Sequence, residues 1–353
     1  IRLAFALLGP IILMVTFGYG ISFDVEELPY AVYDQDKSQE SRQLLENFSS
    51  SRYFVERPPI TEPGGVETRL KSGELKFAIE VPSGFGKDLL KGEQPEVGVW
   101  LDGAMPFRAE TARGYIQGVT AQYIADMATR QSGHPVSVSP VSIETRFRYN
   151  QAFKSTYAIT PGCIMLLCIL IPAMMTAVGI VREKEMGSIT NLYSTPVTRM
   201  EFLLGKQLPY IAIAYASFIS LCVLVMLVFA VPLKGSFAAL AVGALLYVWA
   251  TTGFGMLVSS FVNSQIAAIF ATAILAMIPT MNFSGFMTPV STLGGGAKVM
   301  GAMFPAPYFQ QISVGSFTKG LSFPDLWSNH LFLAGFGMSF FLIATFFLRK
   351  QDV

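Results

Sequence analysis

Residues 158–181 read AITPGCIMLLCILIPAMMTAVGIV, and none of these side chains is acidic or basic. A helix needs about 20 mostly apolar residues to cross the hydrocarbon layer of a bilayer. This stretch therefore predicts a membrane-spanning helix. Five further windows of the same character lie at residues 3–21, 207–231, 237–262, 266–288 and 331–348. Together they predict a polytopic α-helical membrane protein with six transmembrane helices.

The charged residues gather in one part of the chain. They make up 14% of the 353 residues, against about 25% in soluble proteins, and most of them lie between residues 21 and 154. Strand-like runs at 30–33, 53–55, 77–81 and 97–101 alternate there with helix-like runs at 38–49 and 110–129, and residues 136–147 read as extended chain. This pattern predicts an inserted mixed α/β extracytoplasmic domain over residues 22–156.

Positive charges near the ends of the spans set the predicted orientation. Arg2, four basic residues within 182–206, and Arg349 with Lys350 all fall on one side if there are six spans. The positive-inside rule assigns that side to the cytoplasm. Residues 1–21 then form the first transmembrane helix, which starts at Ile1 and is expected to be truncated at its N-terminus. Residues 157–353 hold the other five helices.

The segment 289–325 is too polar and too interrupted by Gly and Pro to span the membrane. It predicts an outer re-entrant segment with short helices, because non-spanning backbone at membrane depth must be covered by protein or face water. It could serve as a lid over a pathway or as a structural plug between helices. Both interpretations stay open.

Recognisable catalytic motifs are missing from the sequence. Gly205-Lys206 lacks the upstream glycine and the following Ser or Thr of a P-loop. His134 and His330 have no partner at metal-ligand spacing, so we predict no catalytic residue, metal or cofactor in this chain. The spans also lack charged residues near their centres, where ion-coupled transporters need them. Any transport would therefore draw its energy from a partner or an attached domain.

The segment 182–197 predicts a short amphipathic helix on the cytoplasmic side. Its charged start holds Glu183 and Glu185, which we expect near the helix N-terminus, where the dipole favours acidic residues. Pro196 ends it, and Thr198 with Glu201 predicts a capping box for the next helix. Its apolar face comprises Met186, Ile189, Leu192 and Tyr193. Such a helix could dock into a groove on a soluble partner or lie on the membrane surface.

The same segment resembles the signature of the ABC-2 family of exporter permeases. The matching residues are Glu183-Lys184-Glu185, Gly187-Ser188, Leu192, Thr195-Pro196-Val197 and Gly205-Lys206. The resemblance implies a permease of an ATP-driven exporter, coupled through 182–206 to ABC ATPase domains that bind ATP and Mg and lie in the same polypeptide or a separate subunit. The coupling residues it implies are Glu183, Lys184, Glu185, Met186, Gly187, Ile189, Leu192, Tyr193 and Pro196.

A closer resemblance rests on the runs at 17–27, 99–106 and 191–193. They are similar to the C-terminal membrane part of the bacterial ribosome-associated ATPases, in which two ABC ATPase domains are fused to such a permease. This implies the bacterial inner membrane and a periplasmic adaptor protein as a further partner. Contact with a ribosome would belong to a part of the protein outside this chain, because this chain has no basic patch for phosphates.

A single set of six spans with no charged lining offers no evident route, so we expect the pathway to lie between two permease copies or homologues. The candidate lining residues are Thr160, Thr176, Ser217, Ser220, Thr251, Thr252, Thr272, Asn282 and Ser284. The alternative for each is a hydrogen bond between helices. The rival function is a non-transporting membrane anchor of a ribosome-associated ABC ATPase, with an outer domain that binds a partner. The substrate cannot be read from the sequence.

Overall fold

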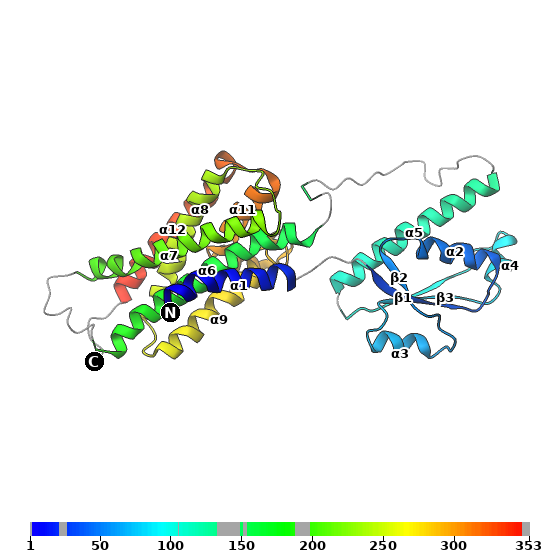
Figure 1. Ribbon diagram of the computed structural model, residues 1–353, viewed down its shortest axis with the longest axis horizontal. Coiled ribbons are helices and arrows are strands. Elements are labelled where there is room, and N and C mark those ends of the chain that lie inside the picture. The colour runs from blue at the N-terminus through cyan, green and yellow to red at the C-terminus, as the bar shows by residue number, and fades with distance from the viewer. Residues whose placement is uncertain are drawn as a thin grey trace. The chain divides into compact units, whose positions relative to one another are not determined.

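The computed structural model describes residues 2–20, 27–104, 106–132, 149–150, 154–187 and 198–347. The chain forms two compact units (Figure 1). One comprises Ile1–Ser22 and Phe147–Val353, and the other comprises Phe23–Arg146. Each unit is described separately below.

The first unit is helical. Its long helices are α1 (Arg2–Gly20), α6 (Ser155–Glu185), α7 (Arg199–Leu227), α8 (Phe237–Ser259), α9 (Gln265–Phe283) and α12 (Phe323–Phe347). Within the described residues, α6, α7, α8, α9 and α12 are long and apolar enough to cross a membrane, whereas the apolar part Ala6–Gly20 of α1 is shorter. The chain is therefore a polytopic membrane protein with five candidate spans, and the sixth span stays a prediction.

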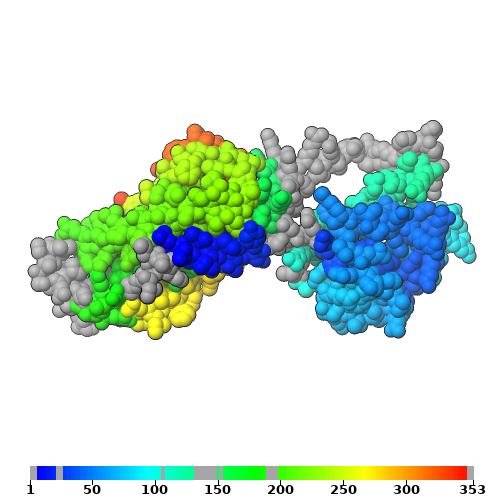
Figure 2. Space-filling model, in the orientation of Figure 1, coloured from blue at the N-terminus to red at the C-terminus, as the bar shows by residue number. Residues whose placement is uncertain are grey.

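Helix α6 is the central element of this unit. It contacts α1, α7, α8, α9 and α11 (Ala306–Val314), and most of its side chains are buried. Helix α1 lies along α7 at the surface (Figure 2). The α6–α8 contact is close, because a Cβ atom on Gly255 would lie 2.2 Å from the carbonyl oxygen of Ala173. Across the same seam, the Tyr247 hydroxyl donates to the Met165 carbonyl at 3.1 Å.

Capping residues decide where two helices begin. Helix α7 starts at Arg199, and Thr198 and Glu201 form the predicted capping box, which is confirmed. Helix α12 starts at Phe323, eight residues before the predicted span. The Asp325 carboxylate accepts hydrogen bonds from the Ser322 backbone N–H and hydroxyl. This cap and Pro324 in the first turn favour an early start, which a window of apolar residues cannot detect.

The segment between α9 and α12 contains short helices rather than a span. They are the 3-10 helix η2 (Val290–Thr292), α10 (Gly295–Ala302), α11 and the π-helix η3 (Gly315–Lys319). Helix α11 packs into the bundle: the Phe309 ring stacks on Tyr247 with centroids 4.4 Å apart, and Ser313 donates to the Pro161 carbonyl at 2.7 Å. The lid role of this segment stays a prediction.

The second unit contains a four-stranded sheet with strand order β2-β1-β3-β4. The strands are β1 (Leu28–Asp34), β2 (Phe54–Glu56), β3 (Phe77–Val81) and β4 (Gly98–Leu101). Strand β1 runs parallel to β2 and β3, and β4 is antiparallel to β3. These strands match the four predicted strand-like runs to within a few residues. The predicted extended chain at 136–147 lies outside the described residues.

Helices cover both faces of this sheet (Figure 1). The helices are α2 (Gln39–Ser49), α3 (Gly65–Lys71), α4 (Phe85–Leu90) and α5 (Pro106–Ser132). One core packs α2, α4 and α5 against one face, around Tyr30, Phe48 and Phe77. A smaller core places α3 on the other face, around Ile60 and Leu75. The sequence did not predict α3 and α4, because helices of seven and six residues are too short to establish a period. The extracytoplasmic location of this unit stays a prediction.

Candidate coupling site

Three consecutive charged residues at the end of α6 each bond to a different helix. Glu183 forms an ion pair with Lys206 of α7. The Lys184 ammonium donates to the Ser259 carbonyl, the last residue of α8, at 2.7 Å. The Glu185 carboxylate accepts the backbone N–H of Gln265, the first residue of α9, at 2.7 Å, and also the side-chain amide of Gln265. Successive residues on a helix point about 100° apart, so three in a row can reach three neighbours around a central helix.

The signs of these charges suit the helix ends that they meet. The last carbonyls of a helix carry a partial negative charge and the first N–H groups a partial positive charge. Lys184 meets the C-terminal end of α8, and Glu185 meets the N-terminal end of α9. The order Glu-Lys-Glu therefore fits the positions of the three surrounding helix ends.

The prediction that residues 182–197 form a separate amphipathic helix is wrong for its first part. Residues 182–185 are the last turn of α6, Met186 and Gly187 form a turn, and Gly187 has φ +68°. Glu183 and Glu185 thus lie at the C-terminus of α6, where the dipole of the helix disfavours acidic side chains. The ammonium group of Lys206 stabilises the Glu183 carboxylate, and the backbone N–H of Gln265 at the start of α9 stabilises the Glu185 carboxylate. Of the other predicted coupling residues, Met186 is 65% exposed.

Four predicted coupling residues lie outside the described part of the chain: Ile189, Leu192, Tyr193 and Pro196. Their docking role stays a prediction. The described coupling residues Glu183, Lys184 and Glu185 bind within the bundle, and their coupling role stays a prediction.

Among the described residues, eight of the nine candidate pathway residues form hydrogen bonds within the chain, and Thr272 is the exception. Four donate to a carbonyl three or four residues earlier in their own helix: Thr160, Thr176, Ser220 and Asn282. Thr251 donates to Cys168 of α6 at 3.0 Å. Thr252 donates to Val248 and accepts the side-chain amide of Gln207. Ser284 accepts the Phe286 backbone N–H.

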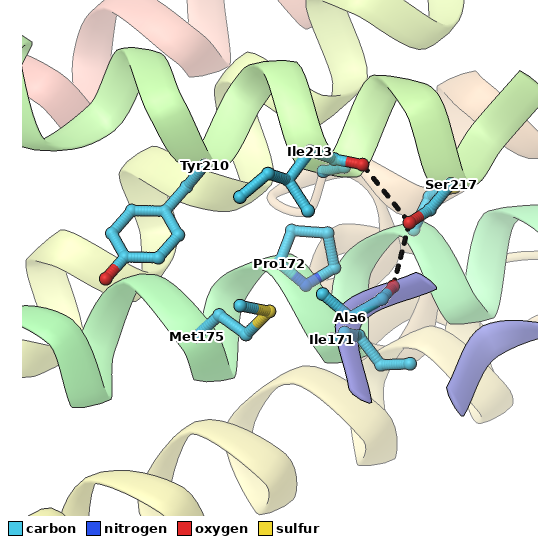
Figure 3. A pocket seen from close by; sticks show the side chains of 9 residues that line it. Ala6, Ile171, Pro172, Met175, Tyr210, Ile213 and Ser217 are labelled. Carbon is cyan, nitrogen blue, oxygen red and sulfur yellow. Dashed lines mark hydrogen bonds between the residues drawn. The ribbon is translucent and has the colours of Figure 1, made fainter. Parts of the chain in front are cut away.

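Ser217 connects α7 to α1. Its hydroxyl lies 2.8 Å from the Ala6 carbonyl and 3.2 Å from the Ile213 carbonyl (Figure 3). The cavity beside it, walled by Pro172, Met175 and Tyr210, has a volume of about 10 Å³. That is room for one water molecule. The recorded contacts of Ser217 are therefore those of a link between helices, and its pathway role stays a prediction.

Thr272 differs from the other candidates. It is fully buried in α9, and its hydroxyl has no hydrogen-bond partner among the described residues. Thr280, two turns further along α9, has the same property. A buried hydroxyl without a partner costs free energy, and both side chains are fully buried within the unit, so neither faces a pathway in this structure.

Sequence reasoning missed two residues of the bonding pattern at the end of α6. Ser259 and Gln265 lie beside the short link between α8 and α9, which the sequence presented only as a separator of spans. In the structure, Ser259 accepts a hydrogen bond from Lys184, and Gln265 donates one to Glu185. The available signal was the isolated Glu-Lys-Glu triplet itself, since charges at a membrane boundary need partners. His330 was also unexpected as a helix link: its ring nitrogens lie 2.7 Å from the Leu326 carbonyl and 2.9 Å from the Ala239 carbonyl of α8.

Comparison with known proteins covers nearly the whole chain. A family profile described as ABC-2 family transporter protein matches residues 2–346. The inner membrane transport permease YhhJ of Escherichia coli is 28% identical over 328 residues, which are 91% of this chain and 85% of YhhJ. The probable multidrug ABC transporter permease YbhS of the same organism is 26% identical over 337 residues, covering 95% and 88% of the two chains.

A more distant relative is the ABC transporter G family member 20 of Dictyostelium discoideum. It is 20% identical over 357 residues, which are 99% of this chain and 48% of the relative. The family match extends from the first helix to the last, and it includes the segment from which the resemblance to ABC-2 permeases was drawn. The similarity to ribosome-associated ATPases stays a prediction. The chain belongs to the ABC-2 family of transporter proteins and is an ABC transporter permease.

Proposed function

We propose that this permease exports its substrate across the bacterial inner membrane, driven by ABC ATPase domains that bind at residues 182–206. The observation that carries this proposal is the bonding of Glu183, Lys184 and Glu185 to three different helices. A partner that pushes on the segment following α6 would move α7, α8 and α9 together. ABC-2 permeases work with ABC ATPases in general, and the name of YhhJ places that relative in the inner membrane.

A second copy or a homologue would complete the pathway. In the part of the chain that the structure describes, the candidate lining residues other than Thr272 bond within the chain, and the cavity beside Ser217 is too small for a substrate. The apolar window of α9 is only 22% buried within this chain. A helix with so much uncovered surface suits contact with lipid or with a partner permease.

The double substitution Ile189→Asp/Leu192→Asp should uncouple transport from ATP hydrolysis. Both side chains lie on the predicted apolar face, and burying two such groups contributes about 3–6 kcal/mol before ordering costs. The measurement is substrate-dependent ATPase activity and transport in liposomes containing the permease and its ATPase. The matched control is Asn191→Asp/Ser194→Asp, which adds the same charge on the polar side of the pattern. Normal transport by the first variant would show that the segment is only a membrane-surface element.

The same assay separates the export function from the rival anchor function. A transporter should hydrolyse ATP faster when substrate is present and should move that substrate. An anchor should leave ATP hydrolysis unchanged by any transported compound while it still holds the ATPase at the membrane. Recruitment of the ATPase to the membrane without any transport by the unaltered protein would favour the anchor.

The predicted orientation can be tested with single cysteines at Ser50 and Ser188. The native cysteines Cys163, Cys168 and Cys222 are buried, so a membrane-impermeant maleimide should report only the new thiols. We expect the Ser50→Cys variant to be labelled in cells with an opened outer membrane, because the positive charges predict that residues 22–156 lie outside. The Ser188→Cys variant should react only after the inner membrane is opened. Labelling of Ser188→Cys in sealed cells would reverse the assignment.

A further inference from the structure

The second unit contains a groove with a volume of about 690 Å³, between α2, α4, β4 and α5. Its floor includes Leu44, Phe48 and Ile79, all of which are buried. Small-molecule sites typically have volumes of about 300–1,000 Å³ and mostly apolar walls. The groove thus has the size and the lining of a ligand site.

The walls of this groove are held in place by hydrogen bonds. The Asp36 carboxylate accepts the backbone N–H groups of Gly84 and Gly86 at 2.8 and 2.9 Å, which fixes the start of α4. Ser38 caps α2 beside it. Hydrogen bonds from Ser38 and from the Gly86 and Gly84 backbone hold the pKa of Asp36 below its ordinary value. The charged Asp36 carboxylate thus ties the start of α4 to the residues that precede α2.

The rim of the groove carries a charged side chain that can distinguish between ligands. Gly92, with φ +81°, turns the chain after α4 so that residues 93–95 line the groove. Glu93 is exposed, and of the described residues that line the groove only Glu93 carries a formal charge. The opposite wall presents Ile124 of α5, which is 41% exposed. An apolar wall that is partly exposed to water favours a ligand with an apolar body, and a nearby carboxylate favours a ligand with a positive group.

We propose that this groove binds amphipathic cations, with the apolar body between α4 and α5 and the cationic group near Glu93. Thr120 and Tyr123 of α5 are among the residues that line the groove. This inference goes beyond the proposed function, because binding in the groove requires neither ATP nor the helical unit's pathway. Its failure would leave the coupling site and the export function untouched.

Protection of an engineered thiol provides the test. The full chain carrying Ile124→Cys, in lipid nanodiscs, is treated with a maleimide in the presence of increasing rhodamine 6G. A probe at about ten times its dissociation constant fills about nine-tenths of the sites, so modification should slow about tenfold. The control Gln117→Cys lies on the same helix, is exposed and does not line the groove; its rate should stay constant. Met127→Cys, also in the lining, gives a second reporter if the first variant misfolds.

The role of Glu93 is tested by adding a second substitution to the Ile124→Cys variant and repeating the protection assay. Glu93→Gln should raise the rhodamine 6G concentration for half-protection about threefold, because an exposed charge pair is worth little more. It should leave protection by the neutral dye Nile red unchanged. Equal rates at Ile124→Cys and Gln117→Cys under saturating probe would overturn the site. Equal protection by the anion anilinonaphthalene sulfonate, or no effect of Glu93→Gln, would overturn its preference for cations.

Discussion

Reversing the charge at position 183 with Glu183→Lys is expected to reduce coupled ATP hydrolysis and transport about tenfold. Glu183 pairs with Lys206, and their side chains are 26% and 36% exposed. The substitution removes this attraction and sets two cations against each other between α6 and α7. We expect a cost of about 1.4 kcal/mol after allowance for solvent screening, which is a tenfold change in a conformational equilibrium. Membrane insertion should be unchanged, because the pair lies at the end of the bundle.

The double variant Glu183→Lys/Lys206→Glu is the decisive comparison. It restores opposite charges at the same two positions, so most of the lost activity should return. Glu67→Lys serves as a control, because its partner Lys71 is on the surface of the second unit and both side chains are more than 70% exposed. If the double variant is as inactive as Glu183→Lys, then Glu183 acts through something other than its pair with Lys206, such as direct contact with the ATPase.

Replacing Gly255 with Ala is expected to abolish most of the folded protein. The new methyl group would lie 2.2 Å from the Ala173 carbonyl oxygen and 2.9 Å from two other backbone atoms of Ala173. Backbone atoms inside the α6–α8 contact cannot rotate away, so the helices must separate. We expect a destabilisation of about 3 kcal/mol or more. The readout is the yield of monodisperse protein in detergent and its thermal unfolding.

Gly335→Ala is the matched control on α12. Nothing lies within 4 Å of a Cβ atom at this position, and replacing a helical glycine by alanine stabilises a helix by about 0.5–1 kcal/mol. The two substitutions are chemically identical, and we predict effects of opposite sign. Unchanged yield and unfolding temperature for Gly255→Ala would mean that α6 and α8 pack less closely than described.

The coupling proposal changes the role of the Glu-Lys-Glu triplet. The resemblance implied that these residues belong to the coupling segment, and their side chains bond to α7, α8 and α9. Under the proposed function, the triplet would transmit a displacement rather than receive it. The exposed Met186 and the segment that follows are then the part that a partner would contact. The two groups of substitutions separate these roles, because Ile189→Asp/Leu192→Asp should weaken partner binding while Glu183→Lys should leave it intact.

The helical elements could be predicted from the sequence because their signal is local. An uncharged run such as 158–181 must become a helix in a bilayer, where every backbone polar group needs an internal partner. The strands Phe77–Val81 and Leu28–Asp34 were also visible as short apolar runs. Helix boundaries were less predictable, since the start of α12 depends on the Ser322–Asp325 cap and not on hydropathy.

The sequence by itself determined the membrane class, the polar insertion after the first apolar run and the segment that resembles ABC-2 permeases, because each is written in contiguous residues. Only the tertiary structure decided which partners the charges acquire. Glu185 and Gln265 are 80 positions apart, and Asp36 and Gly86 are 50 apart. Contacts over such separations follow from how helices and strands pack in three dimensions, and hydropathy and periodicity carry no information about them. The groove beside Glu93 belongs to the same category, since its walls come from four elements that meet only in the folded unit.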